Sequence, residues 1–276
     1  MRKNSRGRLC RIAALTAICA AGAAADPLYS VFCDNRFGTI DSNSGSYAQI
    51  GTLIFSAAAG IGEFNNALYA QSMQGELITV NPAAGASTVI GDAGLNTTSE
   101  VFAGGANGLF EIDSLSDLYS ISPLTGAGSL IGSIGLPANN GGWDTSLSDD
   151  GTNLYFTAGG GGAIDELYQI NTATGLATDL GSTGVSGIAG SAIAGADLDL
   201  FQYNAGTDHI YNAPLGSSSF VAAAVLSTQI VDGGVALSPS AEAFSGATPE
   251  PVTFLLLGSG LVAIGLFRRR KDVSKN

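Results

Sequence analysis

The sequence predicts an all-β fold, a β-propeller of about five four-stranded blades, and the main observation behind this prediction is an internal repeat. A turn glycine and a second glycine six positions later recur at spacings of 40, 41 and 49 residues. Two short runs of alternating apolar residues precede each glycine pair, as in half-buried strands. Four strands in about 40 residues are typical of a propeller blade. The glycine pairs are Gly45 and Gly51, Gly85 and Gly91, Gly126 and Gly132, and Gly175 and Gly181.

The first element expected along the chain is a signal peptide with a short N-terminal helix. Five basic residues within positions 2–11 precede an apolar run at 12–25, which closes with Ala23 and Ala25. A basic start, a short apolar segment and a small-residue site are typical of a secretory leader. We expect signal peptidase to cleave after Ala25, so that the mature protein begins at Asp26.

Each repeat is expected to contain a hairpin, preceded by two further strands. The hairpin turn opens with Asp, Asn or Ser and ends on the first glycine of the pair, which accepts positive φ. Small-residue segments such as 101–105 and 143–148 suit an innermost strand close to a central axis. The expected third strands are 37–40, 77–80, 118–121 and 167–170, and the second strands are marked by Leu28-Tyr29, Leu68-Tyr69, Leu109-Phe110, Leu154-Tyr155 and Leu200-Phe201.

The fifth copy, around residues 210–216, is less regular, and the ring is expected to close through the C-terminal part of the body. The first unit begins at Leu28 and has no room for an inner strand, so segment 234–244 is expected to complete the first blade. Such a join removes an exposed sheet edge. Ala243 and Phe244 also resemble the second strand of another unit, which keeps six blades as the alternative. An open sandwich or a β-solenoid is the competing architecture, although a solenoid usually has a shorter repeat.

The last element expected is a single transmembrane helix that follows a short motif. Pro249-Glu250-Pro251 precedes an uncharged apolar run of 16 residues at 252–267, and then come Arg268, Arg269, Arg270 and Lys271. The run is shorter than the roughly 20 residues that span a bilayer comfortably, and a basic cluster after it stays on the cytoplasmic side. The chain therefore divides into a signal peptide at 1–25, an exported body at 26–247 and an anchor segment at 248–276.

This C-terminal arrangement resembles the PEP-CTERM sorting domain of Gram-negative bacteria. The resemblance implies processing by an exosortase-type membrane protease that recognises Pro249, Glu250 and Pro251, while the apolar helix and residues 268–271 retain the chain in the membrane. It also implies a cell that makes extracellular polysaccharide. The protein is then expected to be exported across the inner membrane, anchored transiently, and delivered to the cell surface or the extracellular matrix.

The charge of the body excludes nucleic acid as a partner. Of the 11 Lys and Arg residues, five lie in residues 1–11 and five in residues 268–276, which leaves Arg36 alone. Of the 23 acidic residues, only Asp272 lies beyond Phe267, so residues 26–267 carry 22 acids and one base. Phosphate neutralisation needs clustered basic side chains. Divalent cations and neutral sugars remain as ligand classes, and self-repulsion of such a surface also keeps an exported protein soluble.

No catalytic or metal-binding constellation is recognisable in the sequence. His209 is the only histidine, which leaves neither a hydrolase triad nor a zinc site, and it is expected in a solvated turn. Carboxylates at 149–150, 165–166 and 197–199 are the remaining ligands for Ca²⁺, but none has the spacing of an EF-hand loop. The segment 149–153 is better interpreted as a tight turn with Asp-Gly at its centre.

Two classes of function stay open on these grounds. The preferred one is a non-enzymatic exported propeller that binds a glycan or a protein, or serves as a structural component, in the extracellular polysaccharide matrix. The alternative is a secreted carbohydrate-active or ester-cleaving enzyme on the same scaffold, in which two carboxylates from different blades act as acid and base. The sequence does not indicate which two would meet, and the fold hosts both classes.

Overall fold

The computed structural model describes residues 28–55, 58–95, 98–138, 145–159, 162–203, 206–228 and 236–238. Within these ranges the chain forms twenty β-strands and no helix, which confirms the all-β prediction. No described segment is a helix with the length and hydropathy needed to cross a membrane. The expected signal helix, the transmembrane helix and the sorting motif lie outside the described residues, as does Trp143.

The strands pair into four sheets that divide into five four-stranded groups, here called units 1 to 5. Unit 1 comprises β20 (Ala236–Ser238), β1 (Leu28–Val31), β2 (Arg36–Ile40) and β3 (Tyr47–Thr52). Unit 2 comprises β4 (Ala58–Phe64), β5 (Ala67–Ser72), β6 (Glu76–Val80) and β7 (Ser87–Asp92). Unit 3 comprises β8 (Ser99–Gly105), β9 (Gly108–Asp113), β10 (Asp117–Ile121) and β11 (Gly128–Ser133). Unit 4 comprises β12 (Thr145–Asp149), β13 (Leu154–Ala158), β14 (Ile164–Ile170) and β15 (Ala177–Ser186). Unit 5 comprises β16 (Ile188–Ala194), β17 (Asp197–Gln202), β18 (His209–Pro214) and β19 (Val221–Val225).

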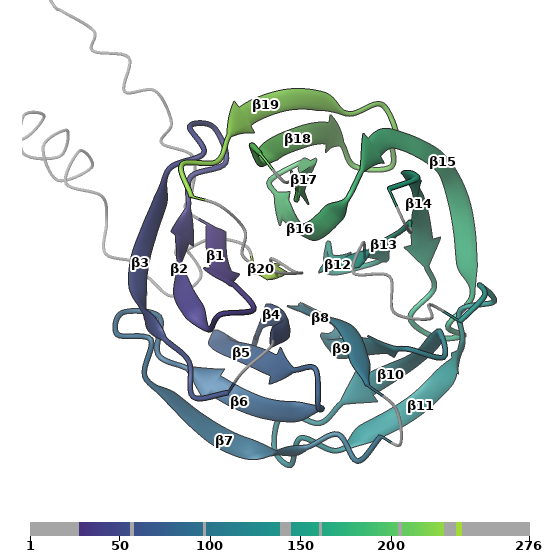
Figure 1. Cartoon of the computed structure of the whole chain (residues 1–276). Coiled ribbons are helices and arrows are strands. Elements are labelled where there is room, and N and C mark those ends of the chain that lie inside the picture. Colours follow the sequence, from purple (N-terminus) through teal and green to yellow (C-terminus); the bar gives the residue numbers. More distant parts are fainter. Residues whose placement is uncertain are drawn as a thin grey trace, which may run out of the picture.

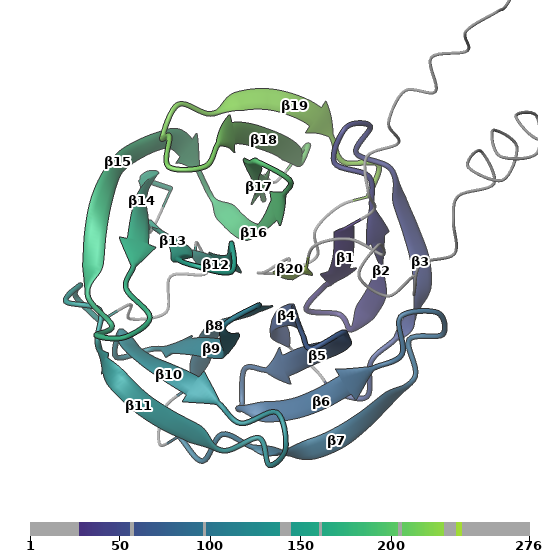
Figure 2. The same cartoon turned by 180° about the vertical axis from the view of Figure 1, so that it is seen from behind.

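The five units are arranged around a common centre, as Figures 1 and 2 show from opposite sides. Strands β20, β4, β8, β12 and β16 are innermost, and β3, β7, β11, β15 and β19 form the outside. Units 2 and 3 join into one eight-stranded sheet through a single parallel pairing of Gly60 with Phe102. A Cβ at Gly60 or Gly62 would overlap the backbone of β8, so glycine permits this close approach of two inner strands.

The hydrophobic core lies between neighbouring units rather than within them. Five clusters of buried side chains occur among the described residues, and each combines residues of two adjacent units, the fifth with the first included. Phe32 of unit 1, for example, packs in one cluster with Phe201 and Ile210 of unit 5. Each unit therefore depends on both neighbours for burial of its apolar faces. An open sandwich or a β-solenoid does not have this radial arrangement.

The predicted hairpin turns are confirmed. The turn glycines have φ between +66° and +83°, and the amide of each donates to the carbonyl oxygen four residues earlier at 2.8 Å. The Asp or Asn that opens three of the turns accepts two further backbone amides through its side-chain oxygen, as Asn81 Oδ1 does from Ala83 and Ala84 at 2.9 and 3.2 Å. These turns are therefore fixed by local chemistry.

The second glycine of each pair connects one unit to the next. It lies at a β-bulge between the third and fourth strands of the unit. There it pairs with the third-strand residue that directly precedes the register shift. A Cβ on Gly51 would lie 2.9 Å from the oxygen of Ala84 and 3.3 Å from Cα of Gly85, in the following turn. Gly132 meets Thr174 and Gly91 meets Thr125 in the same way. In units 1 to 3 the repeat of the two glycines thus reflects direct backbone contact between the hairpin of one unit and the turn of the next, whereas a Cβ on Gly181 of unit 4 would meet only the side chain of Ser218, at 3.4 Å.

The ring closes at unit 1, as the sequence predicts. Strand β20 pairs antiparallel with β1, with Ser30 opposite Leu237. The segment after β19 also contacts unit 1, since the amide of Ser227 donates to Gly45 O at 2.8 Å and Arg36 Nη1 donates to Thr228 Oγ1 at 3.1 Å. Arg36, the single basic residue of the body, further pairs with Asp34 at 2.7 Å.

The expected second strand of unit 5, marked by Leu200-Phe201, is present as β17, but its phase differs from that of the other units. The registers place Leu198, not Leu200, opposite the end of the third strand, where Leu28, Leu68, Leu109 and Leu154 lie in the other units. Asp199 therefore occupies the position that Tyr or the equivalent aromatic or apolar side chain fills elsewhere. It is 3% exposed and accepts a hydrogen bond from Ser42 in the first turn of unit 1. The aromatic signature fails here because this position serves a polar contact across the closure.

We expect Gly91→Ala to destabilise the fold, because the added methyl group would collide with the carbonyl oxygen of Thr125 in the next unit. Such overpacking costs about 1–3 kcal/mol. Thermal and urea unfolding measure the effect. Gly206→Ala is the matched control, since its Cβ would meet no atom within 4 Å. Equal stability of the two variants would contradict the contact between units.

Candidate functional site

One end of the ring gathers the loops between first and second strands and the turns between third and fourth strands. Successive strands of a unit run antiparallel, so these two sets of loops emerge on the same side. We call this side the turn face. It includes residues 65–66, 106–107, 150–153 and 195–196 near the centre, and 41–46, 81–86, 122–127 and 171–176 farther out. Two hollows open there, a lateral pocket and an axial pocket.

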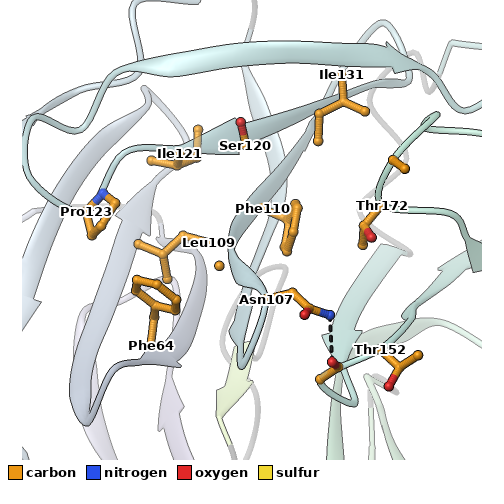
Figure 3. A pocket seen from close by; sticks show the side chains of 13 residues that line it. Phe64, Asn107, Leu109, Phe110, Ser120, Ile121, Pro123, Ile131, Thr152 and Thr172 are labelled. Atoms are coloured by element: carbon orange, nitrogen blue, oxygen red, sulfur yellow. Dashed lines mark hydrogen bonds between the residues drawn. The ribbon is translucent and has the colours of Figure 1, made fainter.

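The lateral pocket has a volume of about 910 Å³ and lies over unit 3, toward unit 4. Figure 3 shows Phe110 at its centre, Phe64 and Pro123 on one side, and Thr152 and Thr172 on the other. Ser120 and Ile131 line it from β10 and β11. The lining also contains Asn107, Gly108, Leu109, Ile121, Gly151 and Ala173, and includes no charged side chain.

A hydrogen bond across two units fixes one wall of the lateral pocket. Asn107 Nδ2, in the turn between β8 and β9, donates to the carbonyl oxygen of Gly151 at 2.6 Å, in the turn between β12 and β13 (Figure 3). The second turn is itself held by Asp150, whose Oδ1 accepts the amides of Thr152 and Asn153 at 2.7 and 2.6 Å. The wall is therefore preorganised.

The axial pocket, about 520 Å³ in volume, is formed by the inner loops of units 2 to 5. Three carboxylic acids line it: Glu63 at the end of β4, and Asp149 and Asp150 at the end of β12. The other lining residues are Phe64, Asn65, Asn66, Gly104, Gly105, Ala106, Gly151, Ile193 and Gly195. Because Phe64 and Gly151 line both pockets, the two hollows adjoin.

Asp149 is the unusual group of the axial pocket. Its side chain is 6% exposed, its Oδ1 accepts the amide of Gly151 at 2.6 Å, and its Oδ2 has no hydrogen-bond partner. Burial raises the pKa of Asp149 to about 6, the hydrogen bond from Gly151 opposes this, and the charge of Asp150 adds to it. Burial also raises the pKa of Glu63. The pocket therefore concentrates negative charge that is poorly solvated.

The structure separates the carboxylates that the sequence suggested as Ca²⁺ ligands. Asp149 lines the axial pocket, Asp165 Oδ2 accepts the amide of Ile188 at 2.8 Å between units 4 and 5, and Asp199 faces Ser42. Among the described residues, no group of three or more His, Cys, Asp or Glu side chains is placed to hold a metal ion. The expected tight turn at 149–153 is confirmed, with Gly151 at φ +84° and Asp150 N bonded to Asn153 O.

The sequence suggested that His209 lies in a solvated turn, and the structure shows that this is wrong. It is the first residue of β18, half-buried, with its ring centre 6.2 Å from that of Tyr211. The residues of the lateral pocket were not identified from the sequence at all. The only signal was positional, since the Asn65-Asn66, Ala106-Asn107 and Asp150-Gly151 pairs all follow an inner strand.

Comparison with known families confirms the C-terminal resemblance. Residues 247–271 match the PEP-CTERM protein-sorting motif. The motif implies export, a membrane-anchored C-terminal sorting signal and processing by an exosortase. Pro249, Glu250, Pro251 and residues 268–271 fall inside the match, and their individual roles remain predictions, as does cleavage at Ala23 and Ala25. No curated protein matches the chain.

One solved structure resembles the body in fold at a TM-score above 0.5. A chain of a nidogen/laminin complex is 11% identical with a TM-score of 0.51, and the match covers 78% of this chain and 99% of that one. Two structures of the extracellular domain of BT4673 from B. thetaiotaomicron are each 17% identical, with TM-scores of 0.41 and 0.43. The two matches cover 71% and 77% of this chain, but only 26% and 31% of the BT4673 chains. At these identities the nidogen/laminin likeness concerns the fold alone.

We expect the protein to become more stable as the pH falls from 7.5 to 5. The pKa values of Asp149 and Asp199 are raised to about 6, in both cases mainly by burial, so the folded state binds protons that the unfolded state releases. Their contribution is complete below the unfolded-state pKa of about 3.9 and is lost as the pH rises through about 6. Each group adds about 1 kcal/mol to the free energy of unfolding over this range.

Urea unfolding at several pH values measures this dependence. The variant Asp149→Asn with Asp199→Asn should be more stable than the wild type at pH 7.5 and should show a flatter profile. Asp117→Asn, which removes one charge at the start of β10 in unit 3, is the control and should keep the wild-type slope. A double variant with the wild-type slope would show that these two acids do not titrate as described.

Proposed function

We propose that residues 26–247 form a five-bladed β-propeller that binds a neutral glycan of the extracellular polysaccharide matrix, without catalysis, through the lateral pocket. The count of five is supported by the five units and by the five cores between them. Export is supported by the sorting motif, and the final location at the cell surface or in the matrix is part of the proposal. A cell that uses exosortase sorting supplies the polysaccharide in this scheme.

The lining of the lateral pocket is the observation that carries this proposal. Its volume lies in the range of about 300–1,000 Å³ that is usual for small-ligand sites. Phe64 offers apolar surface for a sugar ring, while Asn107, Thr152 and Thr172 offer an amide and two hydroxyl groups. The uncharged lining and the strongly acidic body favour a neutral polysaccharide over an acidic one.

An enzyme that cleaves glycans or esters is the second candidate. Glu63 and Asp149 come from different units, line the same axial pocket and both have a raised pKa, as a glycosidase acid requires. Incubation of the exported protein with reducing-end-labelled matrix polysaccharide distinguishes the two functions. Retention without new reducing ends supports the binding protein, whereas turnover that Asp149→Asn abolishes supports the enzyme.

We expect Asn107→Ala to weaken glycan binding about tenfold, because it removes the amide and loosens the wall formed with Gly151. Calorimetric titration of the exported protein with oligosaccharides released from the host polysaccharide measures the loss. Asn43→Ala, an exposed asparagine in the first turn of unit 1, is the matched control and should bind as the wild type does. Unchanged affinity in Asn107→Ala would remove the lateral pocket as the site.

We expect replacement of Pro249, Glu250 and Pro251 by alanine to hold the full tail in the membrane. The wild-type product should begin at Asp26 and lack the segment after the motif, since exosortase recognises this element. Intact-mass analysis of membrane and extracellular fractions from the native host measures both ends. An uncleaved tail in the wild type would mean that the segment is an ordinary anchor.

A further inference from the structure

The axial pocket has a ligand preference of its own, because its charge is uncompensated. Glu63, Asp149 and Asp150 line it, and no Lys or Arg is among its lining residues. The only basic residue in positions 26–267 is Arg36, which pairs with Asp34 and reaches Thr228 at the closure of unit 1. A cationic group that entered the pocket would therefore meet favourable potential from units 2 and 4 without a competing cation.

Asp149 supplies a second reason to expect a ligand there. A carboxylate that is 6% exposed usually has all its oxygens paired, yet Oδ2 of Asp149 has no hydrogen-bond partner. Gly105, which also lines the pocket, lies directly against this carboxylate, and a Cβ at that position would overlap it. The glycine thus allows the backbone of β8 to approach the carboxylate of Asp149 closely. Leaving a buried acceptor unpaired is unfavourable, and a ligand that donates a hydrogen bond would remove this cost.

The arrangement fits an organic cation better than a metal ion. Among the described residues, no three carboxylates converge closely enough to hold a metal. Asp150 is also partly occupied, since its Oδ1 holds the amides of Thr152 and Asn153. A primary ammonium group needs only one or two carboxylates and three acceptors, and the pocket of about 520 Å³ leaves space for the ring that carries it.

We propose that the axial pocket binds the ammonium group of a de-N-acetylated amino sugar, with Asp149 as its principal acceptor. The proposal rests on the proposed function of the lateral pocket, because the two hollows share Phe64 and Gly151 and together accommodate consecutive sugars of one chain. Neutral sugars occupy the lateral pocket, and the amino sugar lies toward the axis. The ligand is accordingly a mainly neutral polysaccharide in which some amino sugars carry a free amino group.

Calorimetric titration of the exported protein with two probes at neutral pH tests this assignment. The probes are short oligomers of glucosamine and of N-acetylglucosamine, which differ only in the amine. The glucosamine oligomer should bind at least tenfold more tightly to the wild type. Asp149→Asn should abolish this difference and leave binding of the N-acetylglucosamine oligomer unchanged. Asp117→Asn, with the same loss of charge outside both pockets, should keep the preference.

The outcomes separate this proposal from the broader one. Equal affinity of the wild type for both oligomers, or a preference that survives in Asp149→Asn, overturns the ammonium site while the glycan-binding function stands. A folded wild type that binds neither oligomer nor the host polysaccharide overturns both. A lysine-containing tripeptide serves as a third probe: if it binds through Asp149 and the glucosamine oligomer does not, the pocket takes peptide amines and the sugar assignment is wrong.

Discussion

The contact on which the structure depends is the one between the hairpin of each unit and the turn of the next. In units 1 to 3 it requires a residue without a Cβ at the bulge, because the oxygen of the following turn lies where a methyl group would be, as for Gly132 against Thr174. The hydrophobic cores also connect neighbouring units, since each core is shared by two of them. A single unit would leave both apolar faces exposed, so the units are stable only as a closed set.

The fifth unit departs from the repeat where the ring closes. Ala224 occupies the position that the bulge glycine has elsewhere, and the contact is made instead by the backbone of Val225 against Gly45. Asp199 replaces the usual Tyr or Phe of its position and meets Ser42. Asp199 and the single basic residue of the body, Arg36, thus both make polar contacts at this junction, where sequence regularity is lowest.

Local chemistry explains how much of the fold was predictable. The turns could be predicted because Asp41, Asn81 or Asn171 binds its own backbone and the following glycine needs positive φ. Closure by β20 followed from the missing inner strand of unit 1. The phase of β17 was not predictable, since Asp199 is explained only by a residue in another unit. The pockets were missed for the same reason: their residues converge from strands and loops of different units, and no local pattern marks convergence.

The position of the closing strand also connects the fold to export. The ring strands occupy residues 28–238, and the sorting match begins at residue 247. The expected leader cleavage after Ala25 precedes β1, and any processing at Pro249 follows β20, so both leave every strand of the ring in place. If the tail were cut before β20, unit 1 would lose its inner strand and expose the edge of β1. The separation of at least eight residues between β20 and the motif therefore allows a membrane protease to act on the tail while the turn face remains assembled.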